Sequence, residues 1–383
     1  MRVAASEVER RELNDLFSEL CRIESPSRQE RGCADRIAAE LRALGLEVSE
    51  DDAGRALGGD CGNLLAELPA ASASAPTVLL CAHMDTVPLA APVRPVLVDA
   101  GWENEGAGIL GADNKAAVAV ILAVARRVAG SGAPVGLQLL FTVGEETSLA
   151  GARQFDVGRL HCDFGYVFDH DSPIGEVIVA SPTQYRLVAS FHGVAAHAGI
   201  APERGRSAIV AAATAIAGMP NGRIDEETTA NVGQIHGGTA MNVVPEHCEV
   251  VAEARSLDPQ RVEALVAEIV EHIQDAANLP HCECDVDVDV ARSFSGYRVA
   301  PGDRALAVAE AALRDCAYAP RRVASGGASD ANVFQALGLP IVNLANGTER
   351  DHEPTERVSV AALEGMLDVG LTLLQRAAED TGG

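Results

Sequence analysis

Polar and apolar positions in the first half of the chain form helical and strand patterns that follow one another. Helical patterns cover about 6–24, 28–45 and 113–129, and strand patterns cover about 46–50, 62–68, 77–82, 135–143 and 164–168. Strands that are interspersed with helices and read as apolar runs are typical of parallel sheets with helices on both faces. This part of the chain therefore predicts an α/β domain with a mostly parallel sheet.

From about residue 182 the strand patterns change to a strict alternation of apolar and polar residues. Residues 184–192 and 284–290 alternate as half-exposed strands do. Between them lie helical patterns at 207–218 and 259–277 and strand patterns at 229–236 and 246–256. The resulting order, strand, helix, strand, strand, helix, strand, predicts an independent α+β layer.

After about residue 294 the first kind of pattern returns. Helical patterns cover 303–316, 329–337 and 359–378, and an apolar strand pattern covers 339–344. The return predicts that one domain is inserted into another. We expect a first domain made of 1–181 and 294–383, and an inserted domain of 182–293.

Composition narrows the class of protein. The chain has 383 residues, of which 48% are hydrophobic and 22% charged, as in soluble globular proteins. It has neither an apolar run long enough for a membrane span nor a signal peptide pattern, and its nine cysteines follow no disulfide framework. We therefore expect a cytoplasmic protein. A formal charge of -25 argues against binding to nucleic acids or to anionic membranes.

Side chains that can bind metals follow the strands of the predicted parallel sheet. They are His83 and Asp85 after the strand at 77–82, Asp113 at the start of a helix, and Glu145, Glu146, Asp169 and His352 after later strands. Ligands of open α/β sheets gather at the carboxyl ends of strands. Clustered carboxylates repel one another unless cations lie among them, and imidazole with carboxylate suits zinc or a similar divalent metal. Two metals that share one carboxylate would use this set fully.

These residues carry a resemblance to a known family. The segments that carry it are His83 to Asp85, Gly111 to Asp113, Gly144 to Glu146, Asp169 and His352. In order and context they resemble the two-zinc peptidases of the peptidase T and carboxypeptidase G type, which also include aminoacylases and succinyl-diaminopimelate desuccinylase. Residues 326–332 and 340–344 resemble the peptidase T branch most. The resemblance covers nearly the whole chain and implies a zinc-peptidase catalytic domain with an inserted, ferredoxin-like lid or dimerisation domain.

The resemblance also implies a role for each of these residues. His83 and Asp169 would bind one Zn²⁺, Glu146 and His352 the other, and Asp113 would bridge the two, with Co²⁺ or Mn²⁺ as alternative metals. Asp85 would orient the imidazole of His83, and the peptide bond after Asp113 would be cis. Glu145 would be the general base that activates a water bridging the metals.

Three residues of the inserted domain match family positions as well. The resemblance implies that His197 stabilises the tetrahedral intermediate, in its own subunit or in that of a homodimer partner. It implies that Asn242 and Arg255 hold a substrate carboxylate, for which the planar fork of an arginine is well suited. The expected dimer would form through the inserted domain.

The expected function is a metal-dependent hydrolase that cleaves a peptide or amide bond of short peptides, as a peptidase T-like aminopeptidase does. An N-acyl-amino-acid deacylase or desuccinylase and a carboxypeptidase G-like enzyme are alternatives, as is a catalytically silent metal-binding scaffold. The segment 350–356 around His352 departs from the family pattern. Lys115, the only lysine, is expected either to form an ion pair with the metal-site carboxylates or to contact substrate.

Overall fold

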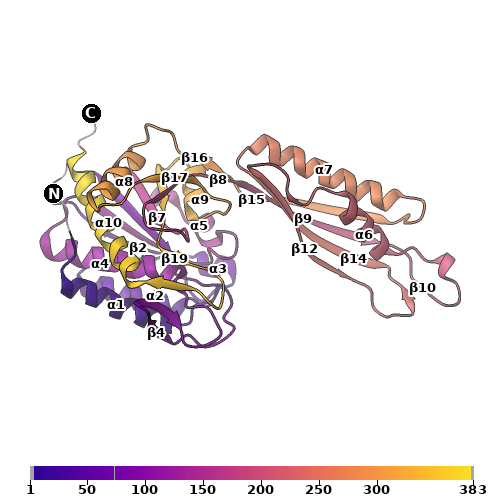
Figure 1. Cartoon of the computed structure of the whole chain (residues 1–383), viewed down its shortest axis with the longest axis horizontal. Coiled ribbons are helices and arrows are strands. Elements are labelled where there is room, and N and C mark those ends of the chain that lie inside the picture. Colours follow the sequence, from indigo (N-terminus) through magenta and orange to yellow (C-terminus); the bar gives the residue numbers. More distant parts are fainter. Residues whose placement is uncertain (1–3, 73, 381–383) are drawn as a thin grey trace. The chain divides into compact units, whose positions relative to one another are not determined.

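The computed structural model describes residues 4–72 and 74–380. The chain divides into two compact units, unit 1 with Met1–Ala180 and Arg298–Gly383, and unit 2 with Ser181–Tyr297. Each unit is described by itself. In unit 1 the N-terminal and C-terminal parts of the chain lie side by side, and the backbone N–H of Ala5 donates to Asp368 (Figure 1).

Unit 1 is built on a mixed sheet. The order of its strands is β1 (Val48–Glu50), β2 (Leu64–Leu68), β6 (Gly136–Thr142), β3 (Thr77–His83), β7 (Phe164–Phe168), β18 (Ile341–Leu344), β8 (Glu176–Ser181) and β16 (Tyr297–Arg298), with β17 (Arg321–Ala324) also paired to β8. The four central strands from β6 to β18 are parallel, whereas β1, β2 and β8 run antiparallel to a neighbour. The predicted α/β class is confirmed, with antiparallel strands flanking the parallel centre.

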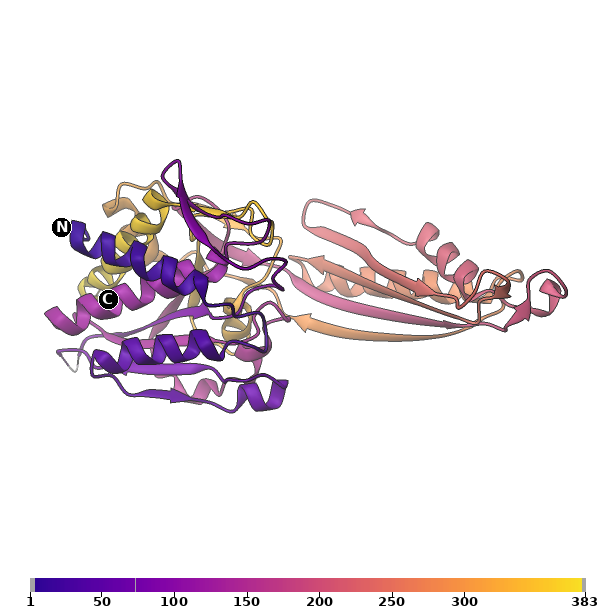
Figure 2. The same cartoon turned by 90° about the horizontal axis from the view of Figure 1, so that it is seen from below.

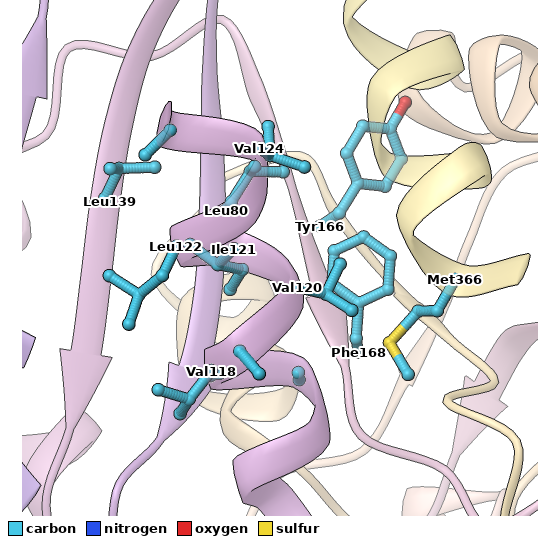
Figure 3. Packing of buried hydrophobic residues seen from close by; sticks show 14 of the residues in the cluster. Leu80, Val118, Val120, Ile121, Leu122, Val124, Leu139, Tyr166, Phe168 and Met366 are labelled. Carbon is cyan, nitrogen blue, oxygen red and sulfur yellow. The ribbon is translucent and has the colours of Figure 1, made fainter. Parts of the chain in front are cut away.

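The core of unit 1 forms around helix α4 (Ala112–Ser131). Its residues from Ala112 to Leu122 are all buried, since α4 packs between the sheet and the helices α1 (Glu7–Arg22) and α10 (Val360–Glu379). Figure 3 shows side chains of α4 beside Leu80, Leu139, Tyr166 and Phe168 of the sheet and Met366 of α10. Burying each such side chain contributes roughly 1.5–3 kcal/mol to folding. The packing fixes the first turn of α4, which carries Asp113.

The remaining helices of unit 1 are peripheral to α4. They are α2 (Arg31–Ala43), α8 (Arg304–Asp315), the short helices α3 (Ala53–Leu57), α5 (Ala150–Gln154) and α9 (Asp330–Ala336), and the 3-10 turn η1 (Val157–Arg159). Helix α1 begins with a capping box, in which Ser6 and Glu9 satisfy each other's backbone N–H groups.

A small antiparallel sheet of unit 1 has no counterpart in the sequence patterns. Its strand order is β19 (Thr348–Glu349), β20 (Arg357–Ser359), β5 (Gly101–Asn104) and β4 (Pro95–Val98). These strands are too short for a period of two to stand out. Asp99 and Ala100, at the turn between β4 and β5, both have positive φ. The sheet matters because the segment between β19 and β20 carries His352.

Unit 2 is an antiparallel sheet with two helices. The strand order is β11 (Gly222–Arg223), β12 (Thr228–Gly237), β14 (His247–Ser256), β9 (Thr183–His192) and β15 (Asp285–Phe294). Helices α6 (Ala208–Gly218) and α7 (Pro259–Asn278) contact each other and pack on one face of this sheet (Figures 1 and 2). The strands β10 (Ala196–His197) and β13 (Val243–Val244) form a separate pair, near the 3-10 turn η2 (Pro202–Arg204).

The chain leaves unit 1 and returns to it at neighbouring positions. Within unit 1, the N–H of Val299 donates to the carbonyl oxygen of Val179 at 2.8 Å. Within unit 2, the N–H of Gly296 donates to the hydroxyl of Thr183, also at 2.8 Å. The two ends of unit 2 are therefore close together. In the described part of the chain, no helix combines the length and the apolar character that crossing a bilayer requires.

Candidate metal centre

The sequence-predicted metal ligands of unit 1 come together at one edge of its sheet. The parallel strands β3 and β6 end in register, with His83 opposite Thr142. Glu145 and Glu146 follow β6, Asp169 follows β7, and Asp113 lies in the first turn of α4. His352 reaches the same place from between β19 and β20 and lies within hydrogen-bonding distance of Asp113.

The two oxygens of Asp113 face two different imidazoles. Oδ1 lies 3.1 Å from Nε2 of His83, and Oδ2 lies 3.1 Å from Nε2 of His352. The first imidazole also lies 3.7 Å from Oδ1 of Asp169, and the second lies 3.0 Å from Oε1 of Glu146. Each half of the site thus holds one imidazole and one further carboxylate, with Asp113 between the halves. The peptide bond between Asp113 and Asn114 is cis.

The site concentrates carboxyl groups in a buried place. Burial, and then the charge of Asp169, raises the pKa of the Glu145 carboxyl well above its usual range. Burial also raises the pKa values of Glu146 and Asp169. Such a set is costly to keep ionised without cations.

The donor atoms fit divalent cations. Two groups of three residues could each hold a cation, because one donor atom from each residue lies within 4.8 Å of those of the other two. One group is His83, Asp113 and Glu146, and the other is His83, Glu145 and Asp169. Imidazole nitrogen and carboxylate oxygen together suit zinc and similar transition metals.

Asp85 connects the imidazole of His83 to the two glutamates. Nδ1 of His83 lies 3.0 Å from the carbonyl oxygen of Asp85 and 3.3 Å from its Oδ1, which leaves Nε2 directed at Asp113. The carboxylate of Asp85 also accepts from the N–H groups of Glu145 at 2.9 Å and Glu146 at 3.2 Å, and from the hydroxyl of Ser27 at 2.7 Å. One buried side chain therefore orients an imidazole and the backbone of both glutamates.

Glu356 is a residue of this site to which the sequence patterns assigned no role. Its buried carboxylate accepts three backbone N–H groups, from Leu110 at 2.7 Å, Gly111 at 2.8 Å and Asp113 at 2.9 Å. It thereby ties the segment that carries His352 to the loop that presents Asp113. The sequence offered one hint of this role, the position of Glu356 four residues after His352. Its partners are backbone N–H groups, and a pattern of side chains does not reveal which backbone groups a carboxylate binds.

Asp169 is held by a second residue without a predicted role. The side chain of Asn343, on β18, accepts from the N–H of Asp169 at 2.9 Å and donates to its carbonyl oxygen at 2.8 Å. Because β18 is the parallel neighbour of β7, Asn343 fixes the point at which the chain leaves β7.

The prediction that Lys115 forms an ion pair with the metal-site carboxylates is wrong. The side chain is buried, and Nζ donates to the backbone carbonyl oxygen of Ile23 at 2.5 Å. No ion pair joins Lys115 to a site carboxylate within residues 4–72 and 74–380. Lys115 instead connects α4 to the chain just after α1.

The three predicted residues of the inserted domain lie in unit 2. His197 is exposed on β10 and is paired in register with Val243, and the N–H of Ala198 donates to the carbonyl oxygen of Asn242 at 3.0 Å. His197 and Asn242 are therefore neighbours. The guanidinium of Arg255, on β14, donates to both oxygens of Glu253 at 3.1 and 2.8 Å.

Two family models match the chain. Residues 183–279 match the peptidase dimerisation domain of the M20 peptidases, and residues 63–170 match peptidase family M28. The first match covers most of unit 2, and the second includes His83, Asp113, Glu145, Glu146 and Asp169.

Relatives match the chain over almost its full length. The uncharacterized protein YqjE of Bacillus subtilis is 35% identical over 97% of this chain and 100% of its own. The crystal structure of aminopeptidase PepT from Bacillus cereus is 37% identical, with a TM-score of 0.86, and covers 96% of this chain and 99% of its own. The structure of a tripeptidase from Staphylococcus aureus is 32% identical, with a TM-score of 0.91, and covers 97% and 99%. The chain therefore belongs to the M20 metallopeptidases, in the branch that contains peptidase T.

Proposed function

We propose that this protein is a two-metal aminopeptidase that removes the N-terminal residue from tripeptides and similar short peptides. The observation that carries the proposal is the placement of Asp113, whose two oxygens face His83 and His352 separately. His83 and Asp169 would hold one cation, Glu146 and His352 the other, and Asp113 would bridge them. The proposed cation is Zn²⁺, with Co²⁺ and Mn²⁺ as the alternatives to compare.

The cations, when bound, supply Lewis acidity that polarises the scissile carbonyl and makes water easier to deprotonate. Glu145 would take the proton from the attacking water and deliver it to the leaving amine. Its carboxyl is buried beside His83 and Asp169, and its backbone N–H is held by Asp85 at 2.9 Å. A general base in this position contributes roughly 10²–10⁴-fold to the rate.

Residues of unit 2 would bind the substrate. We propose that Arg255 and Asn242 hold the carboxylate of the peptide and that His197 donates a hydrogen bond to the oxyanion of the tetrahedral intermediate. In this structure the fork of Arg255 is paired with both oxygens of Glu253, so a substrate carboxylate would share or replace that partner. His197 is exposed, so its imidazole is free of the protein core.

The test is a substrate panel measured after the protein has been treated with a chelator and reloaded with Zn²⁺, Co²⁺ or Mn²⁺. We expect the N-terminal amino acid to be released from tripeptides, with an at least tenfold lower rate for N-acetyl and N-succinyl amino acids. We also expect the chelated protein to lose at least about 99% of its turnover and to regain it on reloading. If the protein releases amino acids preferentially from the N-acyl compounds, it is a deacylase and not an aminopeptidase. If neither class of substrate is turned over, the protein is a catalytically silent metal-binding protein.

We also propose that the protein is a homodimer that forms through unit 2. Ile209 and Val210 on α6 and Ile235 on β12 are large apolar side chains that are 37, 44 and 46% exposed. The outer edge of β12 is paired only at Thr229 and Ala230 in the described part of the chain. The match to a dimerisation domain supports a second copy as the partner of this surface.

The dimer is tested by light scattering on Ile235→Lys. The charge is expected to convert a dimer into a monomer, because an edge strand that carries lysine resists pairing with another strand. Leu97→Asp is the matched control, since Leu97 is 58% exposed in unit 1 and its replacement should leave the dimer intact. A monomeric wild-type protein, or a dimer that survives Ile235→Lys, would contradict the proposal.

A further inference from the structure

A second cluster of possible metal ligands lies apart from the residues described above. Glu30, Asp60 and Cys61 each offer one donor atom, and these atoms lie within 4.8 Å of one another. Glu30 directly precedes α2, and the other two residues follow α3. Glu30 and Cys61 line a cavity of about 270 Å³ that also borders Gly144.

Glu30 carries the observation that points to a bound cation. Its side chain is buried, with 1% exposed, and Oε1 accepts from the N–H of Gly144 at 3.1 Å. Within the described residues, Oε2 has no partner, although it is buried. Leaving a buried carboxylate oxygen unpaired costs free energy, and a cation in the cavity would remove that cost.

The chemistry of the three side chains selects the kind of cation. A thiolate with two carboxylates suits borderline and soft divalent ions such as Zn²⁺ and Cd²⁺, whereas Mg²⁺ and Ca²⁺ prefer oxygen ligands alone. Burial raises the pKa of the Cys61 thiol, so the thiol is protonated until a cation binds. Coordination forms the sulfur-to-metal bond and releases the thiol proton to water.

The surrounding charges limit the affinity of such a site. Arg28 and Arg153 also line the cavity, and the backbone N–H of Arg31 donates to Oδ1 of Asp60 at 3.0 Å. Positive charge near a divalent cation weakens its binding. The site should therefore be weaker than the centre around Asp113, for which three carboxylates and two imidazoles are the proposed ligands.

The position of the cavity connects it to the metal centre. Gly144 directly precedes Glu145 and Glu146, and Glu30 accepts from its N–H. We propose that Glu30, Asp60 and Cys61 form a third, inhibitory cation site for Zn²⁺ or Cd²⁺. A cation bound at Oε2 pulls on the same carboxylate whose Oε1 holds the N–H of Gly144, so that the segment carrying the two glutamates shifts and turnover falls.

The experiment titrates Cd²⁺ into the holoenzyme whose catalytic positions hold Zn²⁺. The first readout is the ultraviolet charge-transfer absorption of a cadmium–thiolate bond, which the carboxylates and imidazoles around Asp113 cannot produce. We expect one such bond per chain, together with an at least fivefold loss of tripeptide turnover. The predicted loss of turnover rests on the proposed function, whereas the predicted absorption does not. A failure of the cation site and a failure of the proposed function can therefore be told apart.

Three variants complete the design. Cys61→Ala should lose the absorption and the inhibition, and Asp60→Asn, which changes an exposed side chain, should weaken Cd²⁺ binding by at least tenfold. Cys162→Ala is the control and should behave as the wild type, because Cys162 lies outside the cluster. The site is refuted if the absorption persists in Cys61→Ala, or if Asp60→Asn binds as the wild type does. Its inhibitory role is refuted if Cd²⁺ binds without loss of turnover.

Discussion

Glu145→Gln is expected to lower kcat for tripeptide hydrolysis by about 10³-fold while the protein keeps its full metal content. Glutamine has nearly the shape of glutamate but cannot accept the proton of the attacking water. The backbone N–H of residue 145 would still be held by Asp85, so the ligands around it should stay in place. The measurements are steady-state kinetics and metal analysis of the same sample.

Its control is the neighbouring change, Glu146→Gln. Oε1 of Glu146 lies 3.0 Å from Nε2 of His352, whereas Asp169 lies beside His83. Replacing its charged oxygen should reduce the metal content by about one ion per chain, and the rate should fall as a consequence. Equal metal loss in both variants, or normal turnover in Glu145→Gln, would refute the assigned roles.

Glu356→Ala is expected to weaken metal binding by about 10–100-fold, although Glu356 is not a proposed ligand. The change leaves the N–H groups of Leu110, Gly111 and Asp113 without their acceptor, and each unpaired buried amide costs about 1–3 kcal/mol. The loop before α4 should loosen, and with it the position of Asp113. Competition with a chelator measures the metal affinity, and thermal unfolding measures the stability.

Two further variants separate positioning from general stability. Glu356→Gln keeps one oxygen for Leu110 and Gly111 but turns an amide N–H toward Asp113, so its metal affinity should lie between those of Glu356→Ala and the wild type. Glu353→Ala, at an exposed position of the same segment, should leave metal binding unchanged. Wild-type metal affinity in Glu356→Ala would show that the loop keeps its position without this carboxylate.

The convergence of His83, Glu146 and Asp169 could be predicted because their strands carry clear patterns. Apolar strands β3, β6 and β7 are parallel neighbours, so the residues that follow them must meet at one edge. The alternation in β9 and β15 was equally informative, because both strands belong to an antiparallel sheet with helices on one face.

Other parts of the site could not be predicted, for identifiable reasons. The strands β19 and β20, which flank His352, have two and three residues, too few for any periodicity. Glu356 and Asn343 act on backbone groups, which are the same in every residue. Lys115 was expected near carboxylates because of its charge, but its partner is a backbone carbonyl, which no charge pattern can reveal.

The close ends of unit 2 have a consequence for how the protein can change over time. The chain leaves unit 1 near Val179 and returns to it near Val299, and these two residues are hydrogen-bonded. With respect to unit 1, unit 2 is therefore a very long loop whose two ends are held together. The entropy of closing a loop grows only slowly with its length, so residues can be gained or lost there at little cost to the sheet. Substrate range, which we assign partly to unit 2, can therefore diverge among relatives while the cation ligands keep their register.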